Sequence, residues 1–156
     1  MSIRVTTDIS TKLVAGKNEA NPPMSELVAH NKPTGHCVSG AVLEAVVVCG
    51  EFTLLFLTDD VPFEDMLSIH LLDMQWRLLD SAVIGGMYLS GSFSGLRLSE
   101  PNFAHFRFIG DTEWTLEILP KRRFYLPFVS NPPGVKYAFG FYRHFLITGS
   151  PHPTSR

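Results

Sequence analysis

The chain has 156 residues, of which 45% are hydrophobic and 18% are charged, and its formal net charge is −2 at pH 7. This length suits a single domain with one core, and the lack of a basic surplus argues against nucleic acid as a partner, because phosphates are usually bound by a basic face. Since a typical chain is about 25% charged, little charge is available to cover the surface, and we expect a homo-oligomer (most simply a dimer) or a protein partner.

The start of the chain and its two cysteines bear on the compartment. The first residues, MSIRVTTDIST, do not resemble a signal peptide, and the longest apolar block, residues 41–57, is interrupted by Glu44 and Glu51. Two cysteines, Cys37 and Cys49, are too few for a disulfide-dense secreted scaffold. We therefore expect two free thiols in a cytoplasmic protein that does not associate with membranes.

Residues 1–39 differ in composition from the rest of the chain. They contain no aromatic residue, whereas every Phe, Tyr and Trp lies between Phe52 and Phe145. Asn, Pro and Gly interrupt this segment repeatedly. We expect a polar, partly irregular arm, in which Ile3 and Val5 form one edge strand and residues 24–30 form one or two helical turns after a Pro pair.

Two valine- and leucine-rich segments follow, AVLEAVVVC and FTLLFLT, separated by Gly50 and Glu51. A two-residue loop that begins with Gly suits a type II′ hairpin, so Cys49 should face Phe52. Both faces of this hairpin are largely apolar, which is typical of strands that are covered on both sides. The segment is therefore expected in the middle of a sheet or between two layers.

Residues 62–84 allow two structures. Acidic residues around Pro62 and a Gly pair at 85–86 would suit the start and end of a single helix. The polar residues of the segment, however, scatter around a helical wheel and leave no solvent-facing stripe. We prefer a hairpin that turns at residues 73–74 and places Trp76 opposite Leu71 and Leu78 opposite Ile69.

The rest of the chain reads as strands at residues 87–98, 103–109, 113–119, 123–129 and 136–148, broken by Gly, Pro and Asn. From residue 40 onward this makes about nine strands. The predicted fold is mainly β, an antiparallel sandwich or a barrel-like meander, and the periodicity does not choose between these two forms. The predicted organisation is an arm at 1–39, one β-rich domain at 40–149 and a short tail at 150–156.

The hairpin predicted from the strands at residues 103–109 and 113–119 determines the first candidate site. Phe106 and Phe108 should share the core face with Trp114 and Leu116, and a loop of odd length centred on Asp111 pairs Phe108 with Trp114. The opposite face then carries His105 across from Glu117 and Arg107 across from Thr115.

A carboxylate beside an imidazole raises its pKa and selects its tautomer, so His105 could act as an acid or base, with Arg107 as an anion anchor. Opposite charges across strands are also the ordinary cover of the exposed face of a sheet. In a closed barrel, the same face would line a ligand pocket.

Other polar residues are weaker candidates. Arg143 shares its face with the aromatic residues of the last strand, so it could extend to solvent, pair with a buried acid, or enter a pocket. In the preferred hairpin His70 faces Arg77 and is expected to be a neutral surface residue. The basic run at residues 121–123 is expected to cap a turn between edge strands. The set His30, His36 and Cys37 has no compact metal-ligand spacing, so no metal site is predicted.

Signatures of catalysis are absent from the sequence: there is no G-x-S-x-G, no P-loop, no H-E-x-x-H and no dinucleotide fingerprint. No catalytic residue and no cofactor is predicted. The first hypothesis is a non-enzymatic β-rich domain that acts through protein–protein interaction or self-association. The alternative is a small-molecule-binding or hydrolytic site, in a barrel or an inter-sheet cavity, that uses His105, Arg107 and Glu117.

Overall fold

The computed structural model describes residues 2–18, 20–61, 65–85, 91–109, 112–126, 132, 134–138 and 140–149. In these residues the protein is all-β and has no helix; thirteen strands form three antiparallel sheets. The described part of the chain therefore contains no helix that is long and apolar enough to cross a membrane. Of the two forms that the sequence allowed, the structure shows the sandwich-like one.

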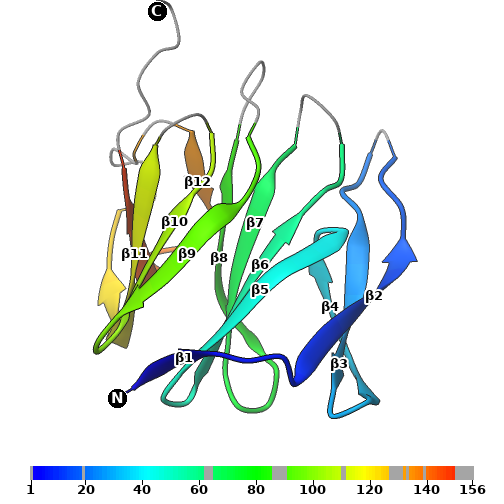
Figure 1. Ribbon diagram of the computed structural model, residues 1–156, viewed down its shortest axis with the longest axis horizontal. Helices are drawn as coiled ribbons and strands as arrows, with labels where there is room; N and C mark the ends of the chain where they lie inside the picture. Colours follow the sequence, from blue (N-terminus) through cyan, green and yellow to red (C-terminus); the bar gives the residue numbers. More distant parts are fainter. Residues whose placement is uncertain are drawn as a thin grey trace, which may run out of the picture.

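The three sheets are stacked as layers (Figure 1). The central sheet has the order β1-β5-β6-β7-β8-β12, with bounds β1 Ile3–Val5, β5 Val42–Cys49, β6 Phe52–Thr58, β7 Leu67–Leu72, β8 Leu78–Ile84 and β12 Val135–Tyr137. One face packs on the sheet β13-β11-β10-β9, with bounds β9 Ser94–Ser99, β10 Phe103–Arg107, β11 Glu113–Phe124 and β13 Tyr142–Thr148. The other face packs on the sheet β2-β3-β4, with bounds β2 Ile9–Ala15, β3 Met24–Ala29 and β4 Lys32–Ser39.

Each face of the central sheet contributes to its own hydrophobic core. Alternation along β6 sends Leu54 and Phe56 to the core against the four-stranded sheet, and Leu55 and Leu57 to the core against the three-stranded sheet. This double burial explains why β6 is apolar on both faces, and it confirms the predicted position inside a sheet. The predicted pairing of Cys49 with Phe52 is also confirmed, and Gly50 has the positive φ of 59° that the first residue of the loop requires.

The hairpin predicted within residues 62–84 is confirmed where the chain is described, since β7 pairs with β8; residues 62–64 lie outside the described residues. The predicted register is wrong, because Leu72 faces Leu78 and Ile69 faces Ala82. The turn is wider than expected: Asp73 Oδ1 accepts hydrogen bonds from the N–H groups of Gln75 and Arg77. Trp76 therefore lies in the turn, with φ 66°, instead of in the strand.

Residues 3–39 have more regular structure than the composition predicted. The edge strand at Ile3 and Val5 is confirmed as β1, which pairs with β5. The helical turns expected at residues 24–30 are wrong, because Met24–Ala29 is the middle strand of the three-stranded sheet. His30 and Asn31, with φ values of 52° and 64°, form the tight turn that follows. Backbone pairing of β3 with β2 and β4 thus stabilises this part of the chain, which has no aromatic side chain.

The later strands differ from the prediction in several places. Of the predicted strand 87–98, residues 87–90 lie outside the described residues, and the strand observed is β9, Ser94–Ser99. The separate strand predicted at 123–129 is not observed: residues 123–124 end β11, residues 125–126 are not in a strand, and residues 127–129 lie outside the described residues.

Pro120 does not end a strand, and β11 continues to Phe124. Pro120 lies in an irregularity of the β11–β13 pairing between Ile118 and Arg123, where a missing N–H interrupts no regular ladder bond. The segment 136–148 is divided between β12 and β13, which belong to different sheets. From residue 40 onward the described residues form nine strands, which is the predicted number, but the ninth results from the division of residues 136–148 and not from a separate strand at 123–129. The proposed division into an arm, a domain and a tail stays a prediction, and residues 150–156 lie outside the described residues.

Candidate functional site

The hairpin of β10 and β11 has the predicted faces but a different register. Phe106 and Trp114 are buried in the core as expected, yet they face each other, and Arg107 faces Glu113. The indole Nε1–H of Trp114 donates to the carbonyl oxygen of Phe108 at 2.7 Å, so Phe108 lies in the connection and not in the ladder. The predicted pairing of Phe108 with Trp114 is therefore wrong by two residues.

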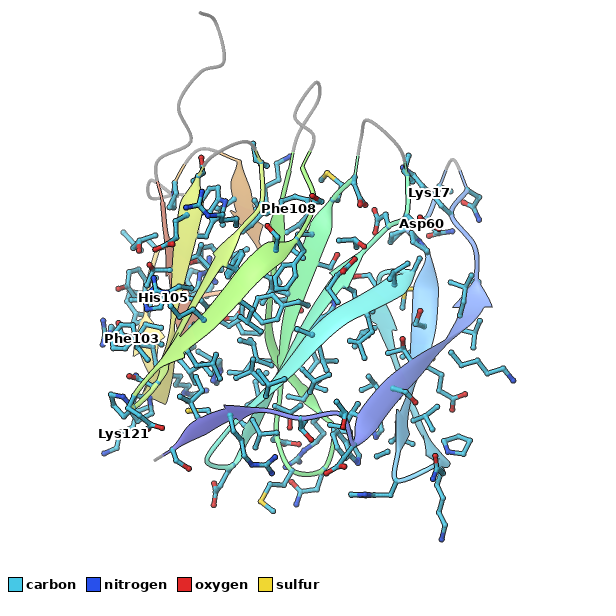
Figure 2. All side chains as sticks on the ribbon, viewed as in Figure 1. Lys17, Asp60, Phe103, His105, Phe108 and Lys121 are labelled. Atoms are coloured by element: carbon cyan, nitrogen blue, oxygen red, sulfur yellow. The ribbon has the colours of Figure 1, made fainter. Side chains whose placement is uncertain are left out.

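This shift separates His105 from the acid predicted to face it. His105 lies opposite Thr115, and Glu117 lies opposite Phe103. The two ring nitrogens of His105 are 3.0 Å from Ser99 Oγ and 3.0 Å from Thr115 Oγ1. Figure 2 labels His105 and Phe103 on the side of the four-stranded sheet away from the central sheet, and Phe108 nearer the centre of the molecule.

An ion pair on the same sheet forms between Arg97 and Glu113, which are 3.1 Å apart and both exposed. Its geometry matches the ordinary cover of a solvent-facing sheet. Binding by His105, Arg107 and Glu117 stays a prediction. These three residues do not line either of the two pockets described below.

Arg143 belongs to β13 and is buried. Its side chain contacts Tyr137 of β12, in the central sheet. Its guanidinium carbon is 4.4 Å from the centroid of the Tyr137 ring, and Nη1 donates to the carbonyl oxygen of Ala138 at 3.4 Å. Asp80 is the buried acid whose carboxylate interacts electrostatically with Arg143. No ion pair joins Arg143 to an acid among the described residues, so the predicted pairing of Arg143 with a buried acid stays a prediction.

Asp80 and Tyr137 have a clear structural role. Asp80 Oδ2 accepts the N–H of His144 at 2.8 Å, and the Tyr137 hydroxyl accepts the N–H of Ile147 at 2.8 Å. Both donors belong to β13, an edge strand of its sheet. Burial raises the pKa of Asp80 and raises the pKa of Tyr137 to about 12. These two side chains therefore tie the edge of one layer to the central sheet.

A pocket of about 510 Å³ lies between β4 and the strands β7, β8 and β12. His70 forms part of its wall and is only 4% exposed, so the expected surface position opposite Arg77 is wrong. Instead, His70 faces Ser81 across the β7–β8 ladder. The pocket is mostly apolar, with Met24, Val38, Met66, Leu78 and Val83 among its lining residues.

His70 hydrogen bonds link three strands. Its Nε2 is 2.9 Å from the carbonyl oxygen of Ser39, and its Nδ1 is 2.8 Å from Ser81 Oγ. A carbonyl oxygen can only accept, so Nε2 carries the proton and Nδ1 accepts from the Ser81 hydroxyl. Burial lowers the pKa of His70, and the Ser39 carbonyl opposes that effect. The imidazole is therefore neutral near pH 7.

An aromatic patch lies where β11 and β13 extend past β10; it consists of Phe124, Phe141, Tyr142 and Arg122. The exposed fractions of the three rings are 59%, 49% and 45%, respectively. Phe124 stacks on Phe141 with centroids 6.2 Å apart, and its centroid is 6.0 Å from that of Tyr142. The guanidinium carbon of Arg122 is 4.2 Å from the Tyr142 centroid.

The basic run Lys121, Arg122 and Arg123 lies within β11, not in a turn; Figure 2 labels Lys121 on the side of the molecule away from the three-stranded sheet. A second pocket, of about 290 Å³, adjoins the aromatic patch and is lined by Arg122, Phe141 and Tyr142 together with residues of β8. The aromatic rings, the Arg122 guanidinium group and a shallow pocket thus share one surface.

Sequence reasoning missed both the His70 pocket and the aromatic patch. The signal for the pocket was the alternation of Ser68 and His70, which marks one face of β7, but the wrong turn length concealed its partner Ser81. The signal for the patch was the basic run directly before Phe124. No group of three or more His, Cys, Asp or Glu residues in the described ranges could hold a metal ion.

Comparison with known proteins identified no matching family model, no matching curated protein and no matching solved structure.

Proposed function

We propose that this protein is a binding module that docks a partner protein through the aromatic patch. The observation that carries the proposal is the cluster of three exposed rings, Phe124, Phe141 and Tyr142, which contact one another at the end of a two-stranded extension. Aromatic residues and arginine are enriched among the residues that dominate binding energy at protein interfaces. Binding at this surface requires no chemical step.

The geometry of Arg122 supports recognition of a carboxylate. The guanidinium carbon of Arg122 lies over the Tyr142 ring, and a guanidinium group carries five N–H donors whose planar arrangement matches a carboxylate. No ion pair joins Lys121, Arg122 or Arg123 to a carboxylate among the described residues. A segment that offers an apolar side chain beside Asp or Glu would match both the rings and the cations.

The same charges favour a different protein over a second copy of this chain. A two-fold dimer brings a surface patch against itself, so the Arg122 side chains of the two copies would lie near each other. Like charges brought together across an interface oppose binding. We therefore propose an acidic, partly apolar partner segment, and self-association is an outcome that the experiment must distinguish. We also propose a cytoplasmic location, which the two free thiols support.

A random peptide library displayed on phage and selected on the immobilised protein tests this proposal. The expected sequences combine Leu, Ile, Phe or Trp with nearby Asp or Glu. A synthetic peptide of the enriched sequence should lose about 30-fold in affinity for Phe124→Ser, the loss typical of a dominant interface residue. Its association should also slow as the salt concentration rises.

The matched control is Leu13→Ser, because Leu13 is also an exposed apolar residue but lies on β2 of the three-stranded sheet. Peptide affinity should not change in this variant. Equal binding of the selected peptides to wild type and Phe124→Ser would contradict the proposal. Light scattering that shows a dimer which Phe124→Ser dissociates would assign the patch to self-association instead.

A further inference from the structure

Ser81, His70 and the Ser39 carbonyl group form a directed chain of hydrogen bonds. Nε2–H of His70 donates to the Ser39 oxygen at 2.9 Å, and Nδ1 accepts from the Ser81 hydroxyl at 2.8 Å. This is the order of a nucleophile, a base and a group that orients the base. Here a backbone carbonyl takes the orienting position that a carboxylate holds in many hydrolases.

The chain of hydrogen bonds faces a cavity. Ser81, His70 and Ser39 all line the pocket of about 510 Å³, a volume within the range of small-molecule sites. Its wall is mostly aliphatic and thioether side chains, with Met24, Met66 and Val83 around the polar group. Such a wall suits an uncharged alkyl chain, since each buried methylene is transferred favourably from water.

Among the described residues that line the pocket, Lys136 alone has a formal charge at pH 7. Lys136 pairs with Val83 on β8. Val83 is two positions from Ser81, so the side chains of Lys136, Val83 and Ser81 lie on the same face of the sheet. Diagonal neighbours of this kind lie about 7–8 Å apart, a separation that a lysine side chain can span. The Lys136 ammonium group can thus stabilise negative charge that develops on a group bound at Ser81.

We propose that Ser81 is a nucleophile for acyl transfer, with His70 as general base, and that the pocket accepts carboxylic esters with an apolar acyl chain. Ser81 Oγ forms a bond to the carbonyl carbon while its proton passes to His70 Nδ1. The bond from that carbon to the leaving oxygen breaks, and the leaving group takes the proton as an alcohol. Water then attacks the acyl carbon and gives one proton to His70 Nδ1. The bond to Ser81 Oγ breaks, the acyl group leaves as a carboxylic acid, and His70 returns the proton to Ser81 Oγ.

The same hydrogen bonds also hold β4 against β7 and β8, and this structural role predicts no reactivity. Diisopropyl fluorophosphate distinguishes the two roles, because it phosphorylates an activated serine with loss of fluoride. The expected result is one adduct per chain, located at Ser81 by peptide mass spectrometry. An adduct spread over other residues, or none at all, would overturn the proposal. This readout uses the wild-type chain and does not depend on the folding of any variant.

Hydrolysis of 4-nitrophenyl esters supplies the second measurement. The acyl chain should raise kcat/KM by about fourfold for each methylene that the pocket accepts, until the pocket is filled. Ser81→Ala and His70→Gln should both reduce hydrolysis to the rate of buffer alone. Ser68→Ala is the matched control, since Ser68 is a buried serine on the same face of β7, two residues from His70. A loss in Ser68→Ala equal to that in Ser81→Ala would also overturn the proposal.

Phe124→Ser separates the ester-hydrolysing site from the proposed docking surface, because Phe124 lines neither pocket. This variant should weaken peptide binding and leave the labelling of Ser81 and the ester hydrolysis rate unchanged. Ser81 also lines the second pocket beside the aromatic patch, so Ser81→Ala is not used to test peptide binding.

Discussion

The face of the central sheet that packs on the four-stranded sheet is lined by aromatic rings, whereas the opposite face is lined by aliphatic side chains. Phe56, Phe106, Trp114 and Phe145 are buried in the first core. The second core has Leu27, Leu55 and Leu57, and Trp76, the aromatic residue among the described ones that pack against it, is only partly buried. Large rings fill the first layer. The smaller side chains and fewer strands of the second layer leave the His70 pocket open at its edge.

This difference follows from the position of the two layers in the sequence. The three-stranded sheet comes from residues 9–39, which contain no Phe, Tyr or Trp. Three strands also cover less of the six-stranded sheet than four strands do. A polar row, His70 and Ser81, lies where this cover ends. We expect the aromatic layer to supply most of the stability and the aliphatic layer to tolerate a chemically useful cavity.

The largest effect should come from Trp114→Ala. The ring is fully buried and its Nε1–H hydrogen bond to Phe108 would be lost. We expect the free energy of unfolding to fall by about 3–5 kcal/mol, measured by chemical denaturation. A cost below about 1 kcal/mol would show that the aromatic layer does not dominate stability.

A smaller loss is expected for Leu27→Ala in the aliphatic layer. Leu27 is fully buried on β3, and its truncation should cost about 2–3 kcal/mol, the lower part of the usual range for this change. The same denaturation experiment measures it. A value equal to or above that of Trp114→Ala would remove the distinction between the two layers.

Acidification should weaken the aliphatic layer through His70. Burial lowers the pKa of His70 below its ordinary value of 6.5, so the unfolded chain binds a proton more readily than the folded chain. The contribution of neutral His70 is complete above pH 6.5 and is lost as the pH falls through the folded-state pKa.

Denaturation midpoints measured between neutral and mildly acidic pH check this sign. The pKa of His144 is lowered as well, so the test is the difference between wild type and His70→Gln. The variant should lose less stability on acidification. An identical pH dependence in the two proteins would mean that His70 does not resist protonation in the folded state.

The smallest effect on stability is expected for Phe124→Ser, outside both cores. Phe124 is 59% exposed, so the free energy of unfolding should change by less than about 1 kcal/mol, even though binding through the aromatic patch should be lost. A large destabilisation would indicate that the stacked rings are part of the fold. In that case, loss of peptide binding in this variant would not identify a docking surface.

From residue 40 onward, the alternation of apolar and polar residues predicted most of the strands, their buried faces and the central position of β5 and β6, whereas β2, β3 and β4 were not predicted. The alternation did not predict which residues face each other across paired strands. In the hairpin of β10 and β11, the predicted pairing is wrong by two residues, yet Phe106 and Trp114 keep their buried face. A shift of two residues preserves the face because side chains alternate with a period of two, and it changes every cross-strand neighbour.

The site depends on those neighbours. The order of residues along β10 and β11 places His105 and Glu117 on one face, but the length of the connection decides that His105 meets Thr115 instead. His70 and Ser81 become partners only through the wide turn organised by Asp73.

The carbonyl of Ser39 reaches His70 only because the three-stranded sheet folds onto the central one. Local patterning therefore assigns each side chain to the core or to the surface, because burial follows the strand period. The length of the turns and the packing of the layers decided which polar groups contact one another, because those contacts join residues far apart in the chain.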